Sequence, residues 1–221
     1  MRRFSALSAR AGELLLDVLA PRCCIACGAP THATLAFCQP CARSLVPAAT
    51  GEIAPGVPLV APFAYGAPLT GALHALKYSG RADLAKPLAR LIAPHIAEHA
   101  SSWDALVPVP LHPLRLAERG YNQAALLARG CAAGTPLRVL PLALTRTRHA
   151  ARQVGQSRGE RLINAQGAFC VREPRALAGK RVALVDDVVT TGATAMACAD
   201  ALRTVGADVC AVVALARAGC P

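Results

Sequence analysis

The chain has 221 residues, a length that suits one α/β domain with a small additional unit. Hydrophobic residues make up 54% of it and its mean hydropathy is +0.38, yet no uninterrupted apolar stretch reaches the roughly 18 residues of a membrane-spanning helix. Only three of the 24 basic residues behind the net charge of +11 are lysine, so the charge reflects either a bias toward arginine or an anionic partner, a phosphorylated small molecule or nucleic acid.

The first twenty residues predict an amphipathic helix that docks on the rest of the molecule. They begin with charge, but Arg10, Glu13 and Asp17 interrupt what would be the apolar core of a signal peptide. We therefore expect a cytoplasmic protein in which the ten cysteines serve as thiols or metal ligands rather than in disulfides. The apolar side chains at helical spacing are Phe4, Leu7, Leu14, Leu15, Val18 and Leu19.

Two Cys-x2-Cys turns follow this helix, separated by ten residues. Two such turns complete the tetrahedral shell of four sulfurs that structural zinc prefers, with no position open for water. Cys23 is an alternative ligand to Cys24, although Gly28 directly after Cys27 favours Cys24, and four free thiols are the alternative to a metal site. We predict that residues 1–45 form the helix and a small zinc ribbon. The predicted ligands are Cys24, Cys27, Cys38 and Cys41.

Residues 46–58 are rich in Pro, Gly and Ala and predict a linker, followed by a second domain over residues 59–221. In that domain continuously apolar strands alternate with helices, which predicts a parallel sheet covered by helices on both faces. The predicted strands are 58–65, 104–110, 137–144, 181–188 and 208–217. The predicted helices lie within 71–96 and at 120–133 and 193–206, and a long polar loop spans 145–169.

The stretch VALVDDVVTTGAT, residues 182–194, is the most specific part of the sequence. Its strand ends at the edge of the sheet where α/β proteins bind ligands. The turn from Thr190 to Thr194 has backbone N–H groups and hydroxyls that converge on one phosphate, and the helix beginning near Ala193 adds its positive end. Gly192 lets the backbone approach the ligand closely.

The adjacent carboxylates Asp186 and Asp187 have a different task, because they would repel a bare phosphate. They should face hydroxyl groups or a divalent cation instead. A ligand with a phosphate at one end and vicinal hydroxyls one sugar-length away satisfies both halves of the stretch, and a 5-phosphoribosyl group has this form. The alternative is an ordinary strand, turn and helix with exposed acids.

VALVDDVVTTGAT closely resembles the ribose-phosphate signature of type I phosphoribosyltransferases. Together with residues 107–128 (VPVPLHPLRLAERGYNQAALLA), residues 152–164 (RQVGQSRGERLIN) and the predicted zinc ribbon, it resembles the ComF/GntX family. The resemblance covers nearly the whole chain, with the motifs in the order of the family. It implies the type I phosphoribosyltransferase fold, a parallel sheet flanked by helices, and ligation of 5-phosphoribosyl diphosphate with Mg²⁺.

The resemblance also implies a role for each motif. Asp186 and Asp187 would hold the ribose hydroxyls, and the turn from Pro110 to Gly120 would be the pyrophosphate loop. Residues 145–168 would be a mobile basic loop that closes over the reaction, unless they are only a solvated basic surface. The residues implied for the 5-phosphate are Thr190, Thr191, Gly192, Ala193 and Thr194. The cations implied for the diphosphate are Arg115 and Arg119, and the residues implied for catalysis are Asp186, Asp187, Arg146 and Arg148. Apart from the resemblance, Lys77 in the stretch GALHALKYSG is expected to be a second anion contact, the alternative being a surface position.

Two departures from related transferases concern catalysis. Thr190 stands where purine-salvage members have an acidic residue, and the loop 145–168 has no lysine where orotate-type members supply one. Two functions therefore remain open. One is an active Mg²⁺-dependent phosphoribosyltransferase with an unidentified acceptor. The other, which we favour, is a ligand-binding protein of natural competence or DNA uptake that works with single-stranded DNA and a competence helicase.

Overall fold

The computed structural model describes residues 23–32, 34–49, 51–146 and 168–219. The predicted helix within residues 1–20 and the site residue Arg148 lie outside these ranges. Among the described residues, seven strands form one sheet in the order β1-β2-β9-β8-β4-β5, with β3 beside β9. The strands are β1 (Gly51–Ala54), β2 (Val57–Val60), β3 (Phe63–Ala64), β4 (Ala105–Pro108), β5 (Arg138–Val139), β8 (Arg181–Val189) and β9 (Asp208–Arg217).

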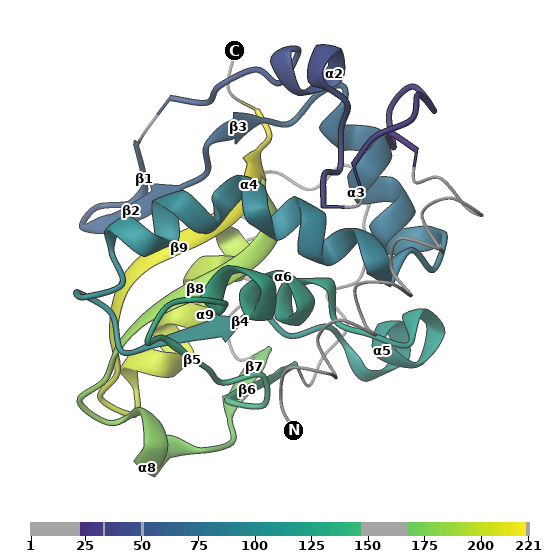
Figure 1. Cartoon of the computed structure of the whole chain (residues 1–221). Helices are drawn as coiled ribbons and strands as arrows, with labels where there is room; N and C mark the ends of the chain where they lie inside the picture. Colours follow the sequence, from purple (N-terminus) through teal and green to yellow (C-terminus); the bar gives the residue numbers. More distant parts are fainter. Residues whose placement is uncertain (1–22, 33, 50, 147–167, 220–221) are drawn as a thin grey trace, which may run out of the picture.

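All neighbouring strands of this sheet run parallel except β1 and β2. Helices cover both of its faces, as the continuously apolar strands predicted, with α4 and α6 on one side and α9 on the other (Figure 1). The helices are α2 (Gln39–Arg43), α3 (Leu69–Tyr78), a 3-10 turn η1 (Ala82–Leu84), α4 (Ala85–Glu98), α5 (Pro113–Arg119), α6 (Gln123–Ala132), α8 (Pro174–Leu177) and α9 (Ala193–Arg203).

Strand β8 shows why the core has two layers. Ala183 and Val185 pack with α3, α4 and α6, whereas Val182 and Leu184 pack with α9 and β7 (Phe169–Val171). All four side chains are buried, because successive residues of a strand point to opposite faces of the sheet. Burying each Leu or Val contributes about 1.5–3 kcal/mol relative to exposure, so the centre of β8 is a rigid support for the residues that follow it.

The segment 46–58 is not an irregular linker. It contains β1 and the start of β2, which pair as an antiparallel hairpin, and β2 then runs parallel to β9 in the main sheet. Gly56 at the turn has a φ of +74°, and Val57 and Leu59 are buried with Pro58 exposed between them. The Gly and Pro residues belong to a tight turn and a half-buried strand rather than to a linker.

Two other predicted elements differ from the observed ones in their bounds or in their type. The strand expected over residues 137–144 is divided between β5, which pairs with β4, and β6 (Leu144–Arg146), which pairs antiparallel with β7. Pro141 lies between them and cannot donate a ladder hydrogen bond. The turn expected from Pro110 to Gly120 contains helix α5, which His112 caps and Gly120, at a φ of +81°, ends.

The cysteine-rich segment packs onto the same core as α3 and α4. Cys24 and Phe37 are buried in it, and Arg90 of α4 donates a hydrogen bond of 2.7 Å to the carbonyl of Thr34. The division of the chain at residues 45 and 58 remains a prediction.

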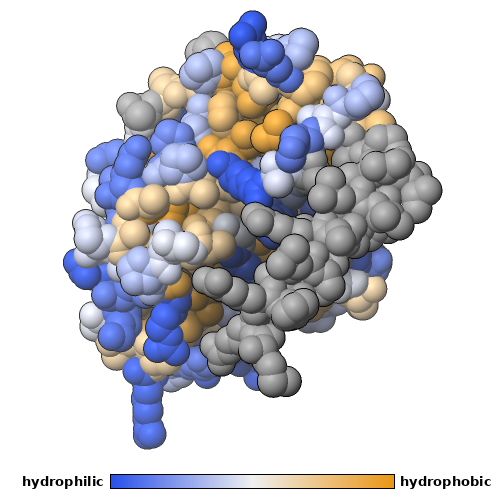
Figure 2. All heavy atoms as spheres, viewed as in Figure 1, coloured by the Kyte–Doolittle hydropathy of each residue, from blue (hydrophilic) through white to orange (hydrophobic). Residues whose placement is uncertain are grey.

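Figure 2 shows the surface of the molecule from the same side as Figure 1. Hydrophobic residues gather on the upper part of this face, with hydrophilic residues around them. No helix in the described part of the chain has the length and apolar character needed to cross a bilayer.

Candidate functional site at the carboxyl ends of β4 and β8

The two central strands β4 and β8 end at the same edge of the sheet. Pro108 of β4 pairs with Val185 of β8, and the N–H of Val109 donates to the Val185 carbonyl at 2.8 Å. The chain after β4 therefore leaves the sheet beside the residue that follows Val185, which is Asp186. This register brings the segment expected to bind pyrophosphate next to the carboxylate pair.

Asp186 and Asp187 have different surroundings. Asp186 accepts a hydrogen bond of 2.8 Å from the N–H of Asp187, and Asp187 accepts one of 2.8 Å from the N–H of Val188. Asp187 is only 3% exposed, whereas Asp186 is half-buried and lines a small pocket of about 50 Å³ with residues 188–195. Of the two carboxylates, Asp186 is the one that lies against the predicted phosphate turn.

Burial raises the pKa of Asp186 to about 8, and the neighbouring charge of Asp187 raises it further in the same direction. The charge of Lys77 acts in the opposite direction but does not cancel these effects. On the α9 face of β8, the buried Cys198 thiol has a pKa raised well above 9, first by burial and then by the charge of Asp186. The carboxyl of Asp186 is therefore easily protonated unless a ligand or cation stabilises its charge.

Lys77, at the end of α3, reaches the other carboxylate. Its Nζ lies 2.8 Å from Oδ2 of Asp187, and the side chains are 23% and 5% exposed. Oδ2 makes no hydrogen bond within the described residues, so the contact is an ion pair without hydrogen-bond alignment. The structure thus brings Lys77, predicted as a substrate contact, into the same cluster as the two acids.

The phosphate turn precedes α9, which begins at Ala193 as predicted. Gly192 has a φ of +78°, and a Cβ placed there would overlap the side chain of Ile53 on β1. The glycine is therefore required by its conformation and by the packing of the β1–β2 hairpin, in addition to any ligand. The N–H of Ala193 donates to Oγ1 of Thr191 at 3.4 Å, a weak bond that a phosphate could replace.

The predicted diphosphate contacts Arg115 and Arg119 lie on α5, and both have partners. Arg115 pairs with Glu118 at 3.3 Å, in an exposed salt bridge worth little. Arg119 donates to Oε1 of Gln123, and its guanidinium lies 5.5 Å from the centre of the Tyr78 ring. Arg119 is thus oriented by Gln123 at the start of α6 and by Tyr78 at the end of α3, whereas Arg115 pairs within its own helix.

Arg146, the described residue of the predicted basic loop that was assigned to catalysis, ends β6. Its guanidinium lies 5.4 Å from the centre of the Phe169 ring, and its buried Nε has no hydrogen-bond partner in the described residues. A buried guanidinium nitrogen without a partner is costly, so Arg146 has an unused donor for an anion. The charge of Arg146 lowers the pKa of the Cys198 thiol whereas that of Asp186 raises it, so both side chains lie near α9.

Sequence reasoning missed two contributors to this site. Ile53 packs on Gly192 from a segment interpreted as a linker, and nothing local in the sequence indicates that contact. Tyr121 donates from its hydroxyl to the carbonyl of Leu76 at 2.6 Å, tying the start of α6 to the end of α3. The adjacent Asn122 caps α6 by accepting from the N–H of Ala124, as its position after Gly120 indicates.

A larger hollow, of about 640 Å³, lies between α9 and β7. Its lining is mainly apolar and includes none of the predicted site residues. The small polar pocket beside Asp186 is the better candidate for a phosphorylated ligand, because its walls provide N–H groups, hydroxyls and a helix N-terminus.

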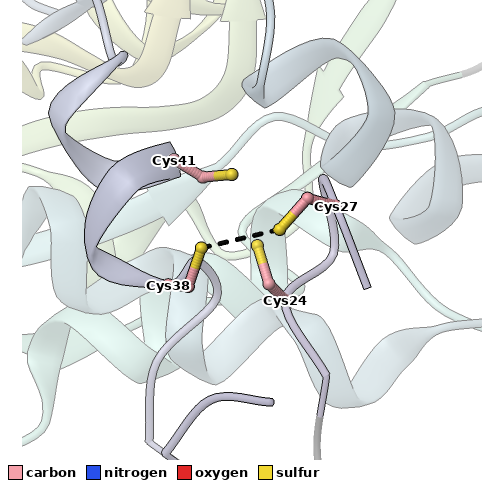
Figure 3. Close-up of side chains that lie close together, drawn as sticks. All are labelled: Cys24, Cys27, Cys38 and Cys41. Atoms are coloured by element: carbon pink, nitrogen blue, oxygen red, sulfur yellow. Dashed lines mark hydrogen bonds between the residues drawn. The ribbon is translucent and has the colours of Figure 1, made fainter. Parts of the chain in front are cut away.

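The four predicted zinc ligands also converge. All four Sγ atoms lie within 4.8 Å of one another, and those of Cys27 and Cys38 are 3.6 Å apart (Figure 3). Four sulfurs at about 2.3 Å from one metal are separated by about 3.8 Å, so this arrangement fits a tetrahedral ion. The cluster contains Cys24 and not Cys23, which decides the alternative that the spacing left open.

The backbone around Cys24 stabilises a thiolate. Burial opposes ionisation there, but the N–H groups of Cys38, Cys27 and Ala26 together lower the pKa of Cys24 to about 6. In contrast, the side chains of Cys27 and Cys38 raise the pKa of Cys41 to about 12. One negative sulfur is therefore easily formed, and further ones need a positive ion among them. The residues present fit a structural metal site.

Comparison with known proteins identifies the family of the chain. The family model described as the phosphoribosyl transferase domain matches residues 82–221. The chain is 34% identical over 200 residues to the DNA utilization protein YhgH of Escherichia coli O6:H1, covering 88% of this chain and 83% of that protein. It is 32% identical over 160 residues to competence protein F of Haemophilus influenzae, covering 70% of each. Among solved structures it is similar to an adenine phosphoribosyltransferase, at 17% identity and a TM-score of 0.40, covering 61% of this chain and 69% of that one.

The fold and the sequence matches define a protein of the type I phosphoribosyltransferase class. Within that class the chain belongs to the ComF/GntX family, because it combines the transferase domain and the four-cysteine cluster with close similarity to competence protein F and YhgH.

Proposed function

We propose that this protein binds 5-phosphoribosyl diphosphate, or a related phosphorylated ligand, and acts in natural competence or DNA uptake. One observation supports the ligand above all: Asp186 and the turn before α9 line the same small pocket. A carboxylate that accepts from ribose hydroxyls thus lies beside N–H groups and hydroxyls that bind a phosphate. In this proposal the 5-phosphate is held by Thr190, Thr191, Gly192, Ala193 and Thr194.

The diphosphate end of the ligand would lie toward α5 and the end of α3. Lys77 and Arg119 are described cations at the end of α3 and on α5, Arg115 is a second cation of α5, and Arg146 of β6 would contact the ligand from the α9 side of the sheet. Arginine suits phosphate because its planar group donates two parallel hydrogen bonds. Mg²⁺ would arrive with the diphosphate, whose oxygens are its preferred ligands, and would offset the charge of the nearby acids.

The cysteine cluster would bind one structural Zn²⁺. Its four sulfurs leave no position for a water molecule, so the metal would support the ribbon rather than take part in a reaction. Because the ribbon packs on α4, its loss would also expose apolar surface of the main core.

The role in DNA uptake is supported by the relatives, one named a competence protein and the other a DNA utilization protein. The net charge of +11 favours single-stranded DNA as a partner, and an exposed Tyr78 beside Arg119 offers a ring and a cation close to the ligand site. A competence helicase would be the second partner. On this reading the protein works in the cytoplasm, without spanning the membrane.

An active phosphoribosyltransferase is the second candidate. Asp186, Asp187, Arg146 and Arg148 would then be catalytic, stabilising the ribose and the departing diphosphate. The observation in its favour is that the Nε of Arg146 has no hydrogen-bond partner in the described part of the chain and can donate to developing negative charge. Thr190 in place of an acid argues against a 6-oxopurine as acceptor.

Calorimetric titration of 5-phosphoribosyl diphosphate with Mg²⁺ tests the first proposal. We expect saturable binding that Asp186→Ala weakens at least tenfold, about 1.4 kcal/mol. Asp200→Ala, which removes an exposed acid of α9 outside the small pocket, is the matched control and should bind as the wild type does. Absence of binding to the wild type, or equal weakening by both variants, would refute it.

Pyrophosphate release, assayed over a panel of amine and base acceptors, separates the two candidates. Release with any acceptor that Arg146→Ala abolishes would establish the transferase. Binding without release would leave the ligand-binding role. DNA contact is tested by titrating single-stranded DNA at low and high salt, and binding that is indifferent to salt would contradict an electrostatic contact.

A further inference from the structure

The adjacent acids at the end of β8 are not equivalent in the structure. Asp186 borders the pocket of the phosphate turn, and its Oδ1 accepts from the N–H of Asp187. Asp187 is absent from the lining of that pocket, is 3% exposed and holds Lys77. Successive residues of a strand leave it toward opposite faces, so the same backbone that aims Asp186 at the turn aims Asp187 at α3.

Lys77 is held where a ligand with two anionic ends needs a second cation. It lies in the last turn of α3, and its ion pair with Asp187 is partly shielded from water. An unpaired lysine on this helix would sample many rotamers and would lose that freedom when a ligand ordered it. The ion pair fixes the ammonium before any ligand arrives.

The end of α3 is also fastened to the segment that follows β4. The Tyr121 hydroxyl donates to the carbonyl of Leu76, and the guanidinium of Arg119 lies over the ring of Tyr78. Lys77, between these two residues in the chain, therefore sits between β8 and the segment expected to bind the diphosphate. The phosphate turn lies on the other side of Asp186, at the start of α9.

We propose that Asp187 is a positioning residue that holds Lys77 for the diphosphate, while Asp186 alone of the two acids contacts the ribose. This inference rests on the proposed binding of 5-phosphoribosyl diphosphate and assigns different roles to the two acids of that site. Lys77 then provides, from the fixed part of the protein, a lysine that the loop 145–168 does not contain. The ammonium can remain paired with the Asp187 carboxylate and still donate to a phosphate oxygen, because it has three N–H donors.

The test compares two ligands that differ only at C1. Both 5-phosphoribosyl diphosphate and ribose 5-phosphate are titrated with Mg²⁺ into the full-length wild type and into variants. The variants are Lys77→Met, Lys77→Arg, Asp187→Asn, Asp186→Asn and the double variant Lys77→Met/Asp187→Asn. Lys86→Met, which removes an exposed lysine of α4, is the control. Folding of each variant is checked by its melting temperature, and Lys77→Met provides the answer if Asp187→Asn does not fold.

We expect Lys77→Met and Asp187→Asn each to weaken the diphosphate about tenfold or more and ribose 5-phosphate less than about threefold. The double variant should be no weaker than Lys77→Met alone, because both changes remove the same contact. Asp186→Asn should weaken both ligands by a similar factor. Lys77→Arg should recover part of the preference for the diphosphate, and Lys86→Met should leave both affinities unchanged.

Equal weakening of both ligands by Lys77→Met, or an unchanged preference in a folded Asp187→Asn, would overturn the inference and leave the ion pair with a structural role only. Additive losses in the double variant would also overturn it. If the wild type bound neither ligand, the proposed function itself would fail and the inference with it. If the wild type bound both ligands, the variants would test only whether the two acids have different roles.

Discussion

The cysteine cluster and the carboxylate pair are both compact groups of ionisable side chains, but they are built in opposite ways. The four cysteines come from one short segment, and their convergence depends on two local turns. The carboxylates are neighbours in the chain, yet their partners come from α3, from the turn before α9 and, through Ile53, from β1. A local motif thus specifies a metal site almost completely, whereas an α/β ligand site needs the assembled sheet.

Removing the metal should have the largest effect, because the cluster has little core of its own. A chelator, or Cys38→Ser, should release one Zn²⁺ per chain and lower the melting temperature by about 10 °C. Metal content by mass spectrometry and thermal unfolding measure both effects. Cys23→Ser is the control, since Cys23 is outside the cluster, and it should keep the metal. Loss of metal from Cys23→Ser would overturn the ligand assignment.

Gly192→Ala tests the dependence of the ligand turn on distant packing. It combines a φ of +78° with overlap on Ile53, so we expect a loss of about 2–4 kcal/mol in the free energy of unfolding by urea. Gly206→Ala is the matched control, because its φ of +79° is similar and nothing lies within 4 Å of its added Cβ. It should lose only about 1 kcal/mol. Equal losses would show that Ile53 adds no constraint.

The two acids should respond with opposite signs when made neutral. Asp187→Asn leaves Lys77 without its partner and should lower the free energy of unfolding by about 1–3 kcal/mol. Asp186→Asn removes a half-buried charge that lies beside another and should raise the free energy of unfolding by about 1 kcal/mol at pH 8. Urea unfolding measures both changes. Destabilisation by Asp186→Asn would contradict the stated cause of its raised pKa.

The pH dependence of stability follows from the same carboxyl. Its pKa is raised from 3.8 to about 8, so between these values the folded protein keeps a proton that the unfolded chain has lost. Stability should therefore fall as the pH rises from 5 toward 8, by at most about 1.4 kcal/mol per pH unit. Asp186→Asn should flatten this part of the profile, while the control Asp200→Asn should not.

The smallest effect is expected at the edge of the site. Arg115→Ala breaks an exposed salt bridge with Glu118 and should change the free energy of unfolding by less than about 0.5 kcal/mol. If Arg115 contacts the diphosphate, ligand affinity will fall while stability does not. A larger loss of stability would show that the helix α5 depends on this pair.

The parts of the fold that were predicted correctly are those with a local cause. Continuous apolar stretches produced β4, β8 and β9, and the start of α9 at Ala193 followed from the turn before it. The predictions of secondary structure were wrong where proline or glycine occurs equally well in a loop and in a regular element. Gly56 and Pro58 belong to a hairpin, and His112 and Pro113 start a helix where a turn was expected. Proline and glycine mark where one element ends, but they do not determine whether a turn, a hairpin or a helix follows.

The sequence alone determined the chemistry of this protein: four thiols at metal-binding spacing, two adjacent acids, and a turn suited to phosphate. These features depend only on residue types and on short separations along the chain, so tertiary packing does not alter them. Only the tertiary structure decided which acid meets the phosphate turn and which meets Lys77, and why Gly192 must lack a side chain. The reason is physical. Alternation along a strand decides which face of the sheet a side chain points to. The residues that it then contacts depend on the helices and turns packed against that face.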